Sequence, residues 1–350
     1  MSSSRPATIR EVAARAGVST ATVSRALRGG VGVEPATRER VEEAARELRY
    51  RPSGVARSLK LRQTRTLGLI VTDISNPYFP QVIRAVEDAA RTRGYSVVLA
   101  DGRRDPEREI QSLELLAARE VDGLLIASSA LTERHRSWIG ERPCPVVIMN
   151  SASSIESVPA VLSDNLAGGR LAAEHLLALG HVHLAFIATP PSANLAVDER
   201  LEGARAAVTD ADLDPASLLV VNGDGGVEGG ERAAREALEA KPDTTALICY
   251  NDLTAVGAMR GARAASRTVP RELSIIGFDD IELAPYVDPP LTTVRQDTDA
   301  MSGWAVSTLL ELIADTTAGV EEEPSERPFQ RIPVELVVRG STGPAATAAC

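Results

Sequence analysis

From Thr66 onward, short apolar segments alternate with segments of helical periodicity, and this alternation limits the fold more than any other feature of the chain. A first series runs from LGLIV to PVVIM, and a second series begins at PAVLSD and runs to LSIIGFDD. Such alternation is typical of parallel sheets covered by helices. We therefore expect an α/β core of two similar, doubly wound parallel-sheet subdomains, with a ligand cleft beyond the carboxyl ends of the strands.

Length and composition allow this core and leave room for another domain. The chain has 350 residues, too many for one ordinary core, and its 44% hydrophobic and 25% charged residues are typical of a globular protein. It has no run of about 18 apolar residues and no apolar stretch near its N-terminus, so we expect neither a membrane span nor a secretory signal. Cys144, Cys249 and Cys350 are scattered without metal-ligand spacing. A cytoplasmic protein with reduced thiols is expected.

Charge is distributed unevenly along the chain. Residues 1–62 hold 13 Lys and Arg against 6 Asp and Glu, a formal charge of +7, whereas the remainder holds 25 against 42, or −17. A basic head on an acidic body favours contact with a polyanion through the head alone. Charge by itself leaves open a basic face that is only solvated.

The start of the chain predicts two short helices joined by a tight turn. Thr8 and Glu11 form a capping box before the first helix, and Gly17 suits the left-handed residue that ends it. Ser19 is a good N-cap for a second helix over 20–27. Apolar residues at helical spacing give each helix a buried face. This arrangement is a helix-turn-helix, part of an all-α head.

The second of these helices carries the candidate DNA-reading residues. In a helix-turn-helix, the N-terminal residues of the second helix meet base edges in the major groove. Arg25 suits a bidentate bond to guanine, and the methyl groups of Thr20 and Ala21 suit contact with thymine. Ser19 and Thr22 are better placed for phosphates. An ordinary α-hairpin with solvated side chains is the alternative that this pattern leaves open.

A third short helix is expected to complete the head. Pro35 suits its first turn, Val41, Ala44 and Leu48 give it a buried face, and it ends before Tyr50. Three short helices make a small domain of marginal stability.

These residues carry a resemblance to a known family. The string TIREVAARAGVSTATVSRAL resembles the head of the lactose-repressor (LacI/GalR) family of bacterial regulators, and VEPATRERVEEAARELRYRPSGVARSLK continues the match. The resemblance implies that Thr20, Ala21 and Arg25 occupy base-reading positions. Two residues depart from the family pattern. Arg28 stands where Asn is usual and is expected to contact DNA, and Glu34 replaces the usual Ser cap of the third helix and weakens that cap.

Residues 53–64 form a hinge whose helix-capable part is too short to be stable alone. In the resembled family this segment folds on the operator, where a leucine from each of two subunits wedges into the minor groove. The matching residue is Leu59, with Lys60 beside it, and such a wedge kinks DNA. Without the resemblance, the segment reads as a flexible linker with an exposed leucine. A segment ordered only on DNA is a switch that the core can control.

The resemblance also covers the core and implies its division. The family core is similar to periplasmic sugar-binding proteins, and its chain crosses three times between the subdomains. We expect a head at 1–52 and a core at 65–342, followed by a disordered tail at 343–350. One subdomain would hold 65–162 and 296–322, and the other 163–295 and 323–342. The matching segments are DISNPYF, HLLALGH, CYNDLTAVGA, VPRELSIIGFDDI, DPPLTTVRQD and ELVVRGST.

Polar and aromatic residues near the strand ends are the candidates for an effector pocket. Tyr78 and Phe79 follow the first strand and suit stacking on a sugar or base ring. Arg200 suits forked hydrogen bonds to hydroxyls or a carboxylate, and Asp279 suits accepting them from hydroxyls. For each residue, a solvated loop position or a structural hydrogen bond is the alternative. The expected set is Tyr78, Phe79, Asn150, Asn194, Arg200, Asn251 and Asp279.

Two positions weaken the expectation of a simple sugar. Gly225 stands where relatives often carry an aromatic ring, and Thr298 stands where another aromatic residue can occur. Because aromatic residues make up only 3% of the chain, the pocket is expected to be more open or more polar than in sugar-induced members. A phosphate ester or a nucleoside remains an alternative effector.

Two other functional classes fit the sequence less well. An enzyme is disfavoured because the sequence contains no nucleophile elbow or P-loop and no credible catalytic set, and we expect no cofactor. His175, His181 and His183 lie close together, but no carboxylate or thiol set accompanies them, so no metal site is expected. A transport protein is disfavoured by the DNA-binding head.

The sequence therefore predicts a transcriptional regulator, more often a repressor than an activator. A homodimer would bind double-stranded, pseudo-palindromic operator DNA with one head on each half-site. A small-molecule effector between the core subdomains would change operator affinity, and no membrane contact is expected.

Overall fold

The protein is described here from a computed structural model that covers residues 7–27, 32–50, 63–127, 131–141, 144–151, 158–189, 195–318 and 328–345. The chain divides into two compact units, residues 1–64 and residues 65–350. Arg28, Leu59, Lys60 and Asn194, which the sequence singled out, lie outside the described residues.

The described residues of the first unit form three short helices around a small apolar core. These are α1 (Ile9–Ala16), α2 (Thr20–Ala26) and α3 (Pro35–Glu47). Val12, Val23 and Val41, one from each helix, are fully buried and lie in one cluster with small alanines. Arg38 Nη1 donates to the Ala26 carbonyl at 2.8 Å, which satisfies an orphan group at the C-terminus of α2.

The helix ends have the predicted capping residues. The Thr8 amide donates to Glu11 Oε2 at 2.6 Å while the Glu11 amide donates to Thr8 Oγ1, so the capping box is confirmed. Gly17 ends α1 at φ +65°, a conformation that favours glycine, and Ser19 accepts from the Thr22 amide at 3.1 Å. Glu34 makes no side-chain hydrogen bond at the start of α3, as expected from the missing serine.

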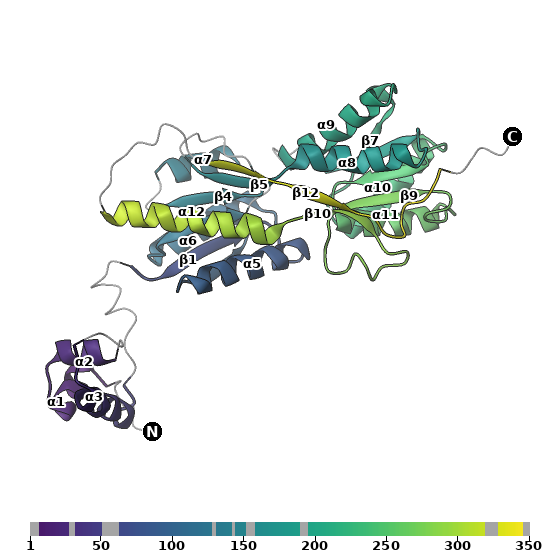
Figure 1. Cartoon of the computed structure of the whole chain (residues 1–350). Helices are drawn as coiled ribbons and strands as arrows, with labels where there is room; N and C mark the ends of the chain where they lie inside the picture. Colours follow the sequence, from purple (N-terminus) through teal and green to yellow (C-terminus); the bar gives the residue numbers. More distant parts are fainter. Residues whose placement is uncertain are drawn as a thin grey trace. The chain divides into compact units, whose positions relative to one another are not determined.

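In the second unit, the first subdomain is built on a six-stranded parallel sheet in the order β11-β5-β4-β3-β1-β2 (Figure 1). Its apolar strands are buried because helices pack against the sheet, as an all-parallel sheet requires. The strands are β1 (Thr66–Val71), β2 (Ser96–Asp101), β3 (Gly123–Ala127), β4 (Val146–Met149), β5 (Ala160–Ser163) and β11 (Phe329–Ile332). The helices are α5 (Tyr78–Thr92), α6 (Pro106–Ala118), α7 (Glu133–Gly140) and α12 (Thr298–Ala318).

The second subdomain repeats this plan with the strand order β12-β10-β9-β8-β6-β7. Its strands pair in parallel except β12, which is antiparallel to β10. The strands are β6 (Leu184–Ala188), β7 (Leu219–Asn222), β8 (Ala246–Cys249), β9 (Ser274–Asp279), β10 (Thr292–Gln296) and β12 (Val334–Val337). The helices are α8 (Asn165–Ala178), α9 (Leu195–Asp210), α10 (Val227–Ala240), α11 (Asp252–Ala264) and the short 3₁₀ turn η1 (Pro215–Ser217).

The chain crosses between the two subdomains at three places: after β5, after β10, and between β11 and β12. The third crossing corrects the predicted boundary at residue 323. β11 pairs in parallel with β5 in the first sheet, with Phe329 beside Ala160 and Ile332 beside Ser163. The chain therefore passes into the second subdomain at Pro333, and only β12 joins the second sheet.

The start of the predicted tail is also corrected. The Gly343 amide donates to Ser274 Oγ at 3.0 Å, and the Ala345 amide donates to the Leu179 carbonyl at 2.8 Å. Residues 343–345 are therefore packed against the second subdomain instead of being disordered. Among the described residues, no helix is both long and apolar enough to cross a membrane.

Candidate functional site

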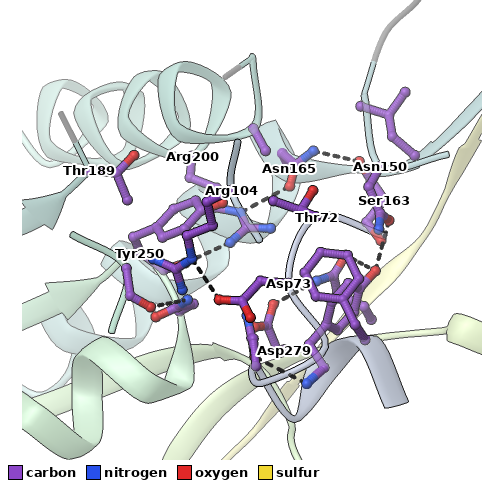
Figure 2. Close-up of a pocket in the computed structure, with 18 of the residues that line it drawn as sticks. Thr72, Asp73, Arg104, Asn150, Ser163, Asn165, Thr189, Arg200, Tyr250 and Asp279 are labelled. Carbon is purple, nitrogen blue, oxygen red and sulfur yellow. Dashed lines mark hydrogen bonds and ion pairs between the residues drawn. The ribbon is translucent and has the colours of Figure 1, made fainter. Parts of the chain in front are cut away.

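A cavity of about 350 Å³ lies in the core where strands of both sheets end (Figure 2). Its lining comes from the residues after β1, β2 and β4 of the first subdomain and after β6, β7 and β8 of the second. The ends of β5, β9 and β10 and residues of α6 and α9 also contribute to the lining. Ligands of open α/β sheets bind beyond the carboxyl ends of the strands, and such pockets span roughly 300–1,000 Å³. This cavity therefore matches a small ligand.

Two aromatic residues at the start of α5 form one wall. The rings of Tyr78 and Phe79 meet edge to face, with centroids 5.4 Å apart and planes at 70°. The Tyr78 hydroxyl donates to Asn150 Oδ1 at 2.8 Å. Burial, together with the charge of Asp279, raises the pKa of Tyr78, so its hydroxyl remains protonated. The wall combines apolar ring surface with a fixed polar edge.

Arg200 enters the cavity from α9 and is held on several sides. Its Nε donates to Asn165 Oδ1 at 2.9 Å, and its Nη1 donates to the Tyr250 carbonyl at 2.6 Å. The guanidinium stacks 3.4 Å from the centroid of the Phe278 ring and 4.9 Å from that of Tyr250. These contacts compensate the buried charge of Arg200 and fix the plane of its guanidinium. The fixed plane sets the direction from which a ligand can approach the group.

Asp279 ends β9 at φ +121° and accepts from Gln296 Nε2 at 2.7 Å. Burial raises its pKa to about 7, against the opposing effects of the Arg200 charge and the Gln296 hydrogen bond. Behind it, Asp252 is buried and accepts from Thr293 Oγ1 at 2.6 Å. Burial, and then the charge of Asp279, raise the pKa of Asp252 well above its ordinary value. The ionisation of Asp279 is therefore sensitive to what enters the cavity.

Asn251 also lines the cavity, and its side chain makes two structural hydrogen bonds. Its Oδ1 caps α11 by accepting from the Thr254 amide at 2.8 Å, and its Nδ2 donates to the Gly225 carbonyl at 3.0 Å. The structural alternative that the sequence left open is therefore realised, although Asn251 remains in the wall.

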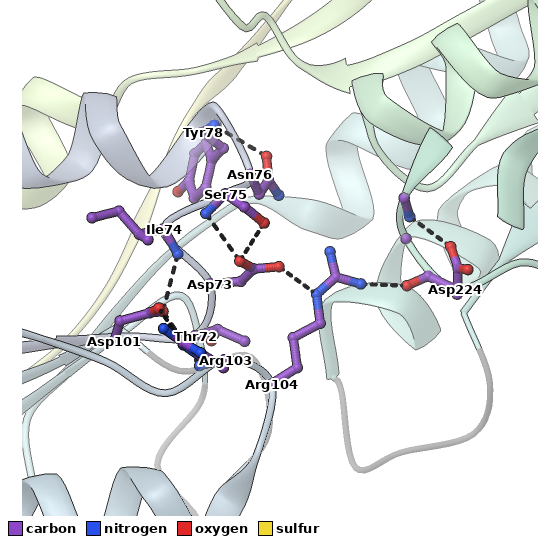
Figure 3. Close-up of polar contacts among 12 residues, drawn as sticks. Thr72, Asp73, Ile74, Ser75, Asn76, Tyr78, Asp101, Arg103, Arg104 and Asp224 are labelled. Carbon is purple, nitrogen blue, oxygen red and sulfur yellow. Dashed lines mark hydrogen bonds and ion pairs between the residues drawn. The ribbon is translucent and has the colours of Figure 1, made fainter. Parts of the chain in front are cut away.

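The ion pair between Arg104 and Asp73 closes the edge of the cavity on the side of β2 (Figure 3). Arg104 Nε donates to Asp73 Oδ2 at 2.8 Å, and Arg104 Nη1 donates to the Asp224 carbonyl at 2.5 Å. Burial alone would raise the pKa of Asp73, but hydrogen bonds from Ser75 and Arg104 outweigh it and hold that pKa below its ordinary value. Asp73 therefore stays charged opposite Arg104.

Unlike the buried residues of the cavity, most of the candidate DNA-reading residues of the head lie at the surface. Thr20, Ala21 and Arg25 are exposed on α2, whereas Val23 and Ala26 of the same helix are buried. Ser19 is exposed as well, and its hydroxyl lies 2.9 Å from the Thr22 hydroxyl at the start of the helix. Exposed N-terminal residues on the second helix of a helix-turn-helix are the ones that can reach base edges.

Known proteins share both parts of this architecture. Residues 8–53 match the family model described as bacterial regulatory proteins, lacI family, and residues 173–342 match that of a periplasmic binding protein-like domain. The chain is 37% identical to the HTH-type transcriptional repressor PurR of Aliivibrio fischeri, over 96% of this chain and 98% of that protein. The chain belongs to the LacI family of bacterial regulatory proteins.

Further LacI-family members support this assignment. The chain is 36% identical to the ribose operon repressor of Escherichia coli, over 96% of this chain and 99% of that protein. The Lac repressor dimer bound to operator and the anti-inducer ONPF matches with a TM-score of 0.84 and 29% identity, over 97% and 100% of the chains. A LacI-family regulator from Enterococcus faecium with bound ribose matches at 0.70 and 29%, over 80% and 99%. This LacI-family chain is a DNA-binding transcriptional regulator.

The fold brings most of the predicted pocket residues of this LacI-family chain together. They come from distant parts of the sequence, and both subdomains contribute. Their roles in binding remain predictions. The residues that line the cavity are Tyr78, Phe79, Asn150, Arg200, Asn251 and Asp279.

Several lining residues were not predicted. Asn165 and Tyr250 hold Arg200, Gln296 holds Asp279, and Arg104 closes the edge. Each of these residues lies at or just after a strand end, and Gln296 also stands in the family-like segment DPPLTTVRQD. Position at a strand end and the match to the family were therefore two signals in the sequence that could have identified them. Thr298, flagged for a missing aromatic ring, begins α12 and is not part of the cavity lining.

His175 and His181, which the sequence places close together with His183, make structural hydrogen bonds. His181 Nε2 lies 2.9 Å from Ser274 Oγ and 3.0 Å from the Gly343 carbonyl, and His175 Nε2 lies 2.9 Å from Thr342 Oγ1. The described residues hold no cluster of three or more His, Cys, Asp or Glu able to bind a metal. These contacts attach the C-terminal segment to the second subdomain.

Proposed function

We propose that this LacI-family regulator binds a neutral, polyhydroxylated effector of monosaccharide size in the core cavity, and that this binding changes its affinity for a pseudo-palindromic operator. The observation that carries the proposal is the lining itself. Aromatic rings form one wall, and fixed hydrogen-bonding groups from both subdomains converge on the remaining space. Pockets for small ligands combine apolar surface with a few placed polar groups.

The charge of the lining favours a neutral effector over a phosphate ester. Asp73, Glu109, Asp224 and Asp279 all line the cavity, while Arg104 is already bound to Asp73. The second arginine of the lining is engaged by an amide oxygen and a main-chain carbonyl. A phosphate dianion would meet several carboxyl groups, whereas sugar hydroxyls can donate to them.

The missing ring at Gly225 disfavours a flat nucleobase. Gly225 has no side chain, so this position offers no ring on which a base could stack. A sugar ring needs apolar contact on one face and hydrogen bonds around its edge. The name of the ribose operon repressor and the ribose bound to the Enterococcus faecium regulator support a pentose as the first probe.

Such an effector would act through the angle between the subdomains. Tyr78, Phe79 and Asn150 belong to the first subdomain, whereas Arg200 and Asp279 belong to the second. A ligand that contacts both groups stabilises the arrangement in which both are within reach. The change would pass through the hinge to the head, where Leu59 and Lys60 are proposed from the sequence alone to contact the minor groove.

The head would read the operator through α2. Thr20, Ala21 and Arg25 are proposed to contact bases, and Ser19 and Thr22 to contact phosphates, with one head on each half-site. Arg28 is proposed as a further DNA contact from the sequence alone.

A homodimer would pair through a face of the core that includes α5 and the loop after β9. Arg84 on α5 and Glu282 in that loop form an ion pair at 3.2 Å, which makes the two elements neighbours. Leu283 and Tyr286 are exposed in the same loop, and 83% of Tyr286 is accessible. Exposed apolar side chains of this kind mark interaction surfaces, and the related Lac repressor was solved as a dimer.

The test has two arms. Enrichment of random DNA duplexes by the full chain should yield a palindromic consensus, and a non-palindromic or absent consensus would refute the operator proposal. Thermal unfolding should then be followed with D-ribose, other monosaccharides, sugar phosphates and nucleobases, because a ligand of the folded state raises its melting temperature. A shift with sugar phosphates or nucleobases alone would overturn the effector class. The affinity for the selected operator is then measured with and without the sugar that raises the melting temperature. The comparison shows whether the effector strengthens or weakens operator binding.

A further inference from the structure

The strand orders show which contacts between the subdomains lie far from the crossings. In the first sheet, β5 and β11 lie at one edge and β2 forms the other. In the second sheet, β10 and β12 lie at one edge and β7 forms the other. All three crossings leave from β5, β10 and β11, so a rotation that opened the cleft would turn about that side. In such a rotation the residues after β2 and β7 would move farthest.

Arg104 follows β2 and binds the loop that follows β7. Its Nη1 donates to the Asp224 carbonyl at 2.5 Å, while its Nε remains on Asp73 of its own subdomain at 2.8 Å (Figure 3). One planar guanidinium thus spans the cleft at the greatest distance from the crossings. Opening the cleft would separate Arg104 from Asp224 before it disturbed contacts near the crossings.

The backbone before this side chain is strained in a way that positions it. Arg103 and Arg104 have φ values of 52° and 58°, in the left-handed region that non-glycine residues rarely adopt. The turn is held because the Gly102 amide donates to the Val71 carbonyl at 2.9 Å and the Arg104 amide donates to the Thr72 carbonyl at 2.8 Å. Strain maintained by its surroundings is characteristic of functional segments.

Gly225 provides the space that the guanidinium uses. Gly225 lies next to Asp224 at φ +78°, and a Cβ atom added there would lie 3.5 Å from Arg104 Nη1 and 3.4 Å from Thr189 Cγ2. A Cβ atom at this position would therefore be in van der Waals contact with the Arg104 guanidinium, so Gly225 lies directly beside the bridge that Arg104 forms.

We propose that Arg104 is a positioning residue that latches the cleft shut by joining Asp73 of the first subdomain to the Asp224 carbonyl of the second across the mouth of the cavity. The latch limits the cavity to ligands that fit beneath the bridge, which excludes chains of sugar units. It does not depend on the identity of the effector, because both acceptors belong to the protein.

The experiment measures cleft opening in the full chain without any ligand. Spin labels are attached at Gln111→Cys on α6 and Glu228→Cys on α10, both exposed positions, in a background in which Cys144 and Cys350 are replaced by serine. Cys249 is buried and is retained. Pulsed electron paramagnetic resonance, with the labelled chain diluted in unlabelled chain, then gives the distance distribution within one molecule.

The R104Q variant should shift this distribution to longer distances and reduce the closed population about three- to tenfold, as expected for losing a charge-assisted hydrogen bond at a partly exposed site. R104K should be intermediate, because lysine retains the pair with Asp73 but lacks a planar fork. Arg104 is 41% exposed, so these variants should fold normally. Unchanged melting temperatures confirm this.

Two controls separate the latch from a general charge effect. R103Q removes the same charge from the same loop, but Arg103 forms an ion pair with Asp101 of its own subdomain at 3.6 Å, so its distribution should match the parent. R331Q removes the ion pair between Arg331 of the first subdomain and Glu199 of the second. This pair lies beside the β11–β12 crossing, where a rotation of the subdomains would move atoms least. An R104Q distribution that superimposes on R103Q, or a larger opening in R331Q, would overturn the latch.

Sugar binding provides a separate outcome. If the parent binds D-ribose, R104Q should weaken that binding by the same factor by which it depletes the closed population. A parent that binds no sugar would refute the proposed effector class, yet the distance measurement would still decide whether Arg104 latches the cleft.

Discussion

The second helix of the head and the cavity of the core both present side chains to a ligand, but they hold those side chains in opposite ways. On α2, Thr20, Ala21 and Arg25 are exposed, and the helix is fixed by its cap and its buried Val23. In the cavity, the polar groups are fixed by hydrogen bonds to one another, as Arg200 is by an amide and a carbonyl. Changes on α2 should therefore affect recognition alone, whereas changes in the cavity should affect stability and recognition together.

The largest effect is expected from Arg200→Ala. The change removes the guanidinium that donates to Asn165 Oδ1 and to the Tyr250 carbonyl, and with it the charge near Asp279. We expect the free energy of unfolding of the core to fall by about 2–4 kcal/mol and the effector response to be lost. Urea denaturation followed by circular dichroism measures the first effect. Arg205→Ala, on an exposed face of the same helix, should change stability by less than about 0.5 kcal/mol. Equal stabilities of the two variants would show that the hydrogen bonds of Arg200 within the cavity do not stabilise the core.

A smaller effect, visible in a pH profile, is expected from Asp279→Asn. Hydroxyl donors favour the ionised carboxylate, so a bound sugar lowers the pKa of Asp279 from about 7 in the free protein. Affinity should accordingly be full above pH 7 and decrease as the pH falls through that value. Asp279→Asn should weaken binding of the active monosaccharide about tenfold and flatten the profile, as measured by calorimetric titration. Asp299→Asn, an exposed control, should keep the parent profile, and a persistent pH dependence in Asp279→Asn would assign it to another group.

Arg25→Ala tests the head side of the comparison. Loss of a bidentate contact should cost about 1–3 kcal/mol at one base pair of the operator while the free energy of unfolding changes by less than about 0.5 kcal/mol. Fluorescence anisotropy against operator variants with single base-pair changes measures the first quantity. Arg10→Ala, an exposed change on α1, should leave base preference intact. Uniform weakening on all sequences would identify Arg25 as a phosphate contact instead.

The smallest effect is expected from Glu34→Ser. Because Glu34 makes no side-chain hydrogen bond at the start of α3, a serine should supply the missing N-cap and stabilise the head by about 0.5–1 kcal/mol. Slower amide hydrogen exchange in α3 of the full chain measures this gain. Glu34→Ala, which offers neither cap nor carboxylate, should exchange faster than the parent. Identical exchange in the serine variant would show that the head derives no stability from this cap.

Local features were predictable because neighbouring residues encode them. The capping box of Thr8 and Glu11, the left-handed Gly17 and the Ser19 cap each involve groups within four residues of one another. The alternation of strands and helices was visible for the same reason, since periodicity is a local property. Together with the resemblance, these features indicated the family, and six of the seven predicted pocket residues line the cavity.

Contacts between distant segments were not predictable in this way. β11 reads as one more short strand, and only its pairing with β5 assigns it to the first sheet. Gly343 belongs to a sequence that resembles a disordered tail, yet Ser274 and His181 bind it. In each case the partner is far away in the sequence, so periodicity and composition do not predict the contact.

The sequence by itself determined the head, the class of the core and the type of side chain at each strand end, because helix caps, apolar periodicity and residue chemistry are local properties. Only the tertiary structure decided how those side chains meet. Two sheets that end on a common cleft bring Tyr78 beside Asn150 and Asp279 beside Gln296, and they carry Arg104 from β2 to the carbonyl of Asp224. Such contacts depend on the order of strands in space, which is set by the packing of the whole core.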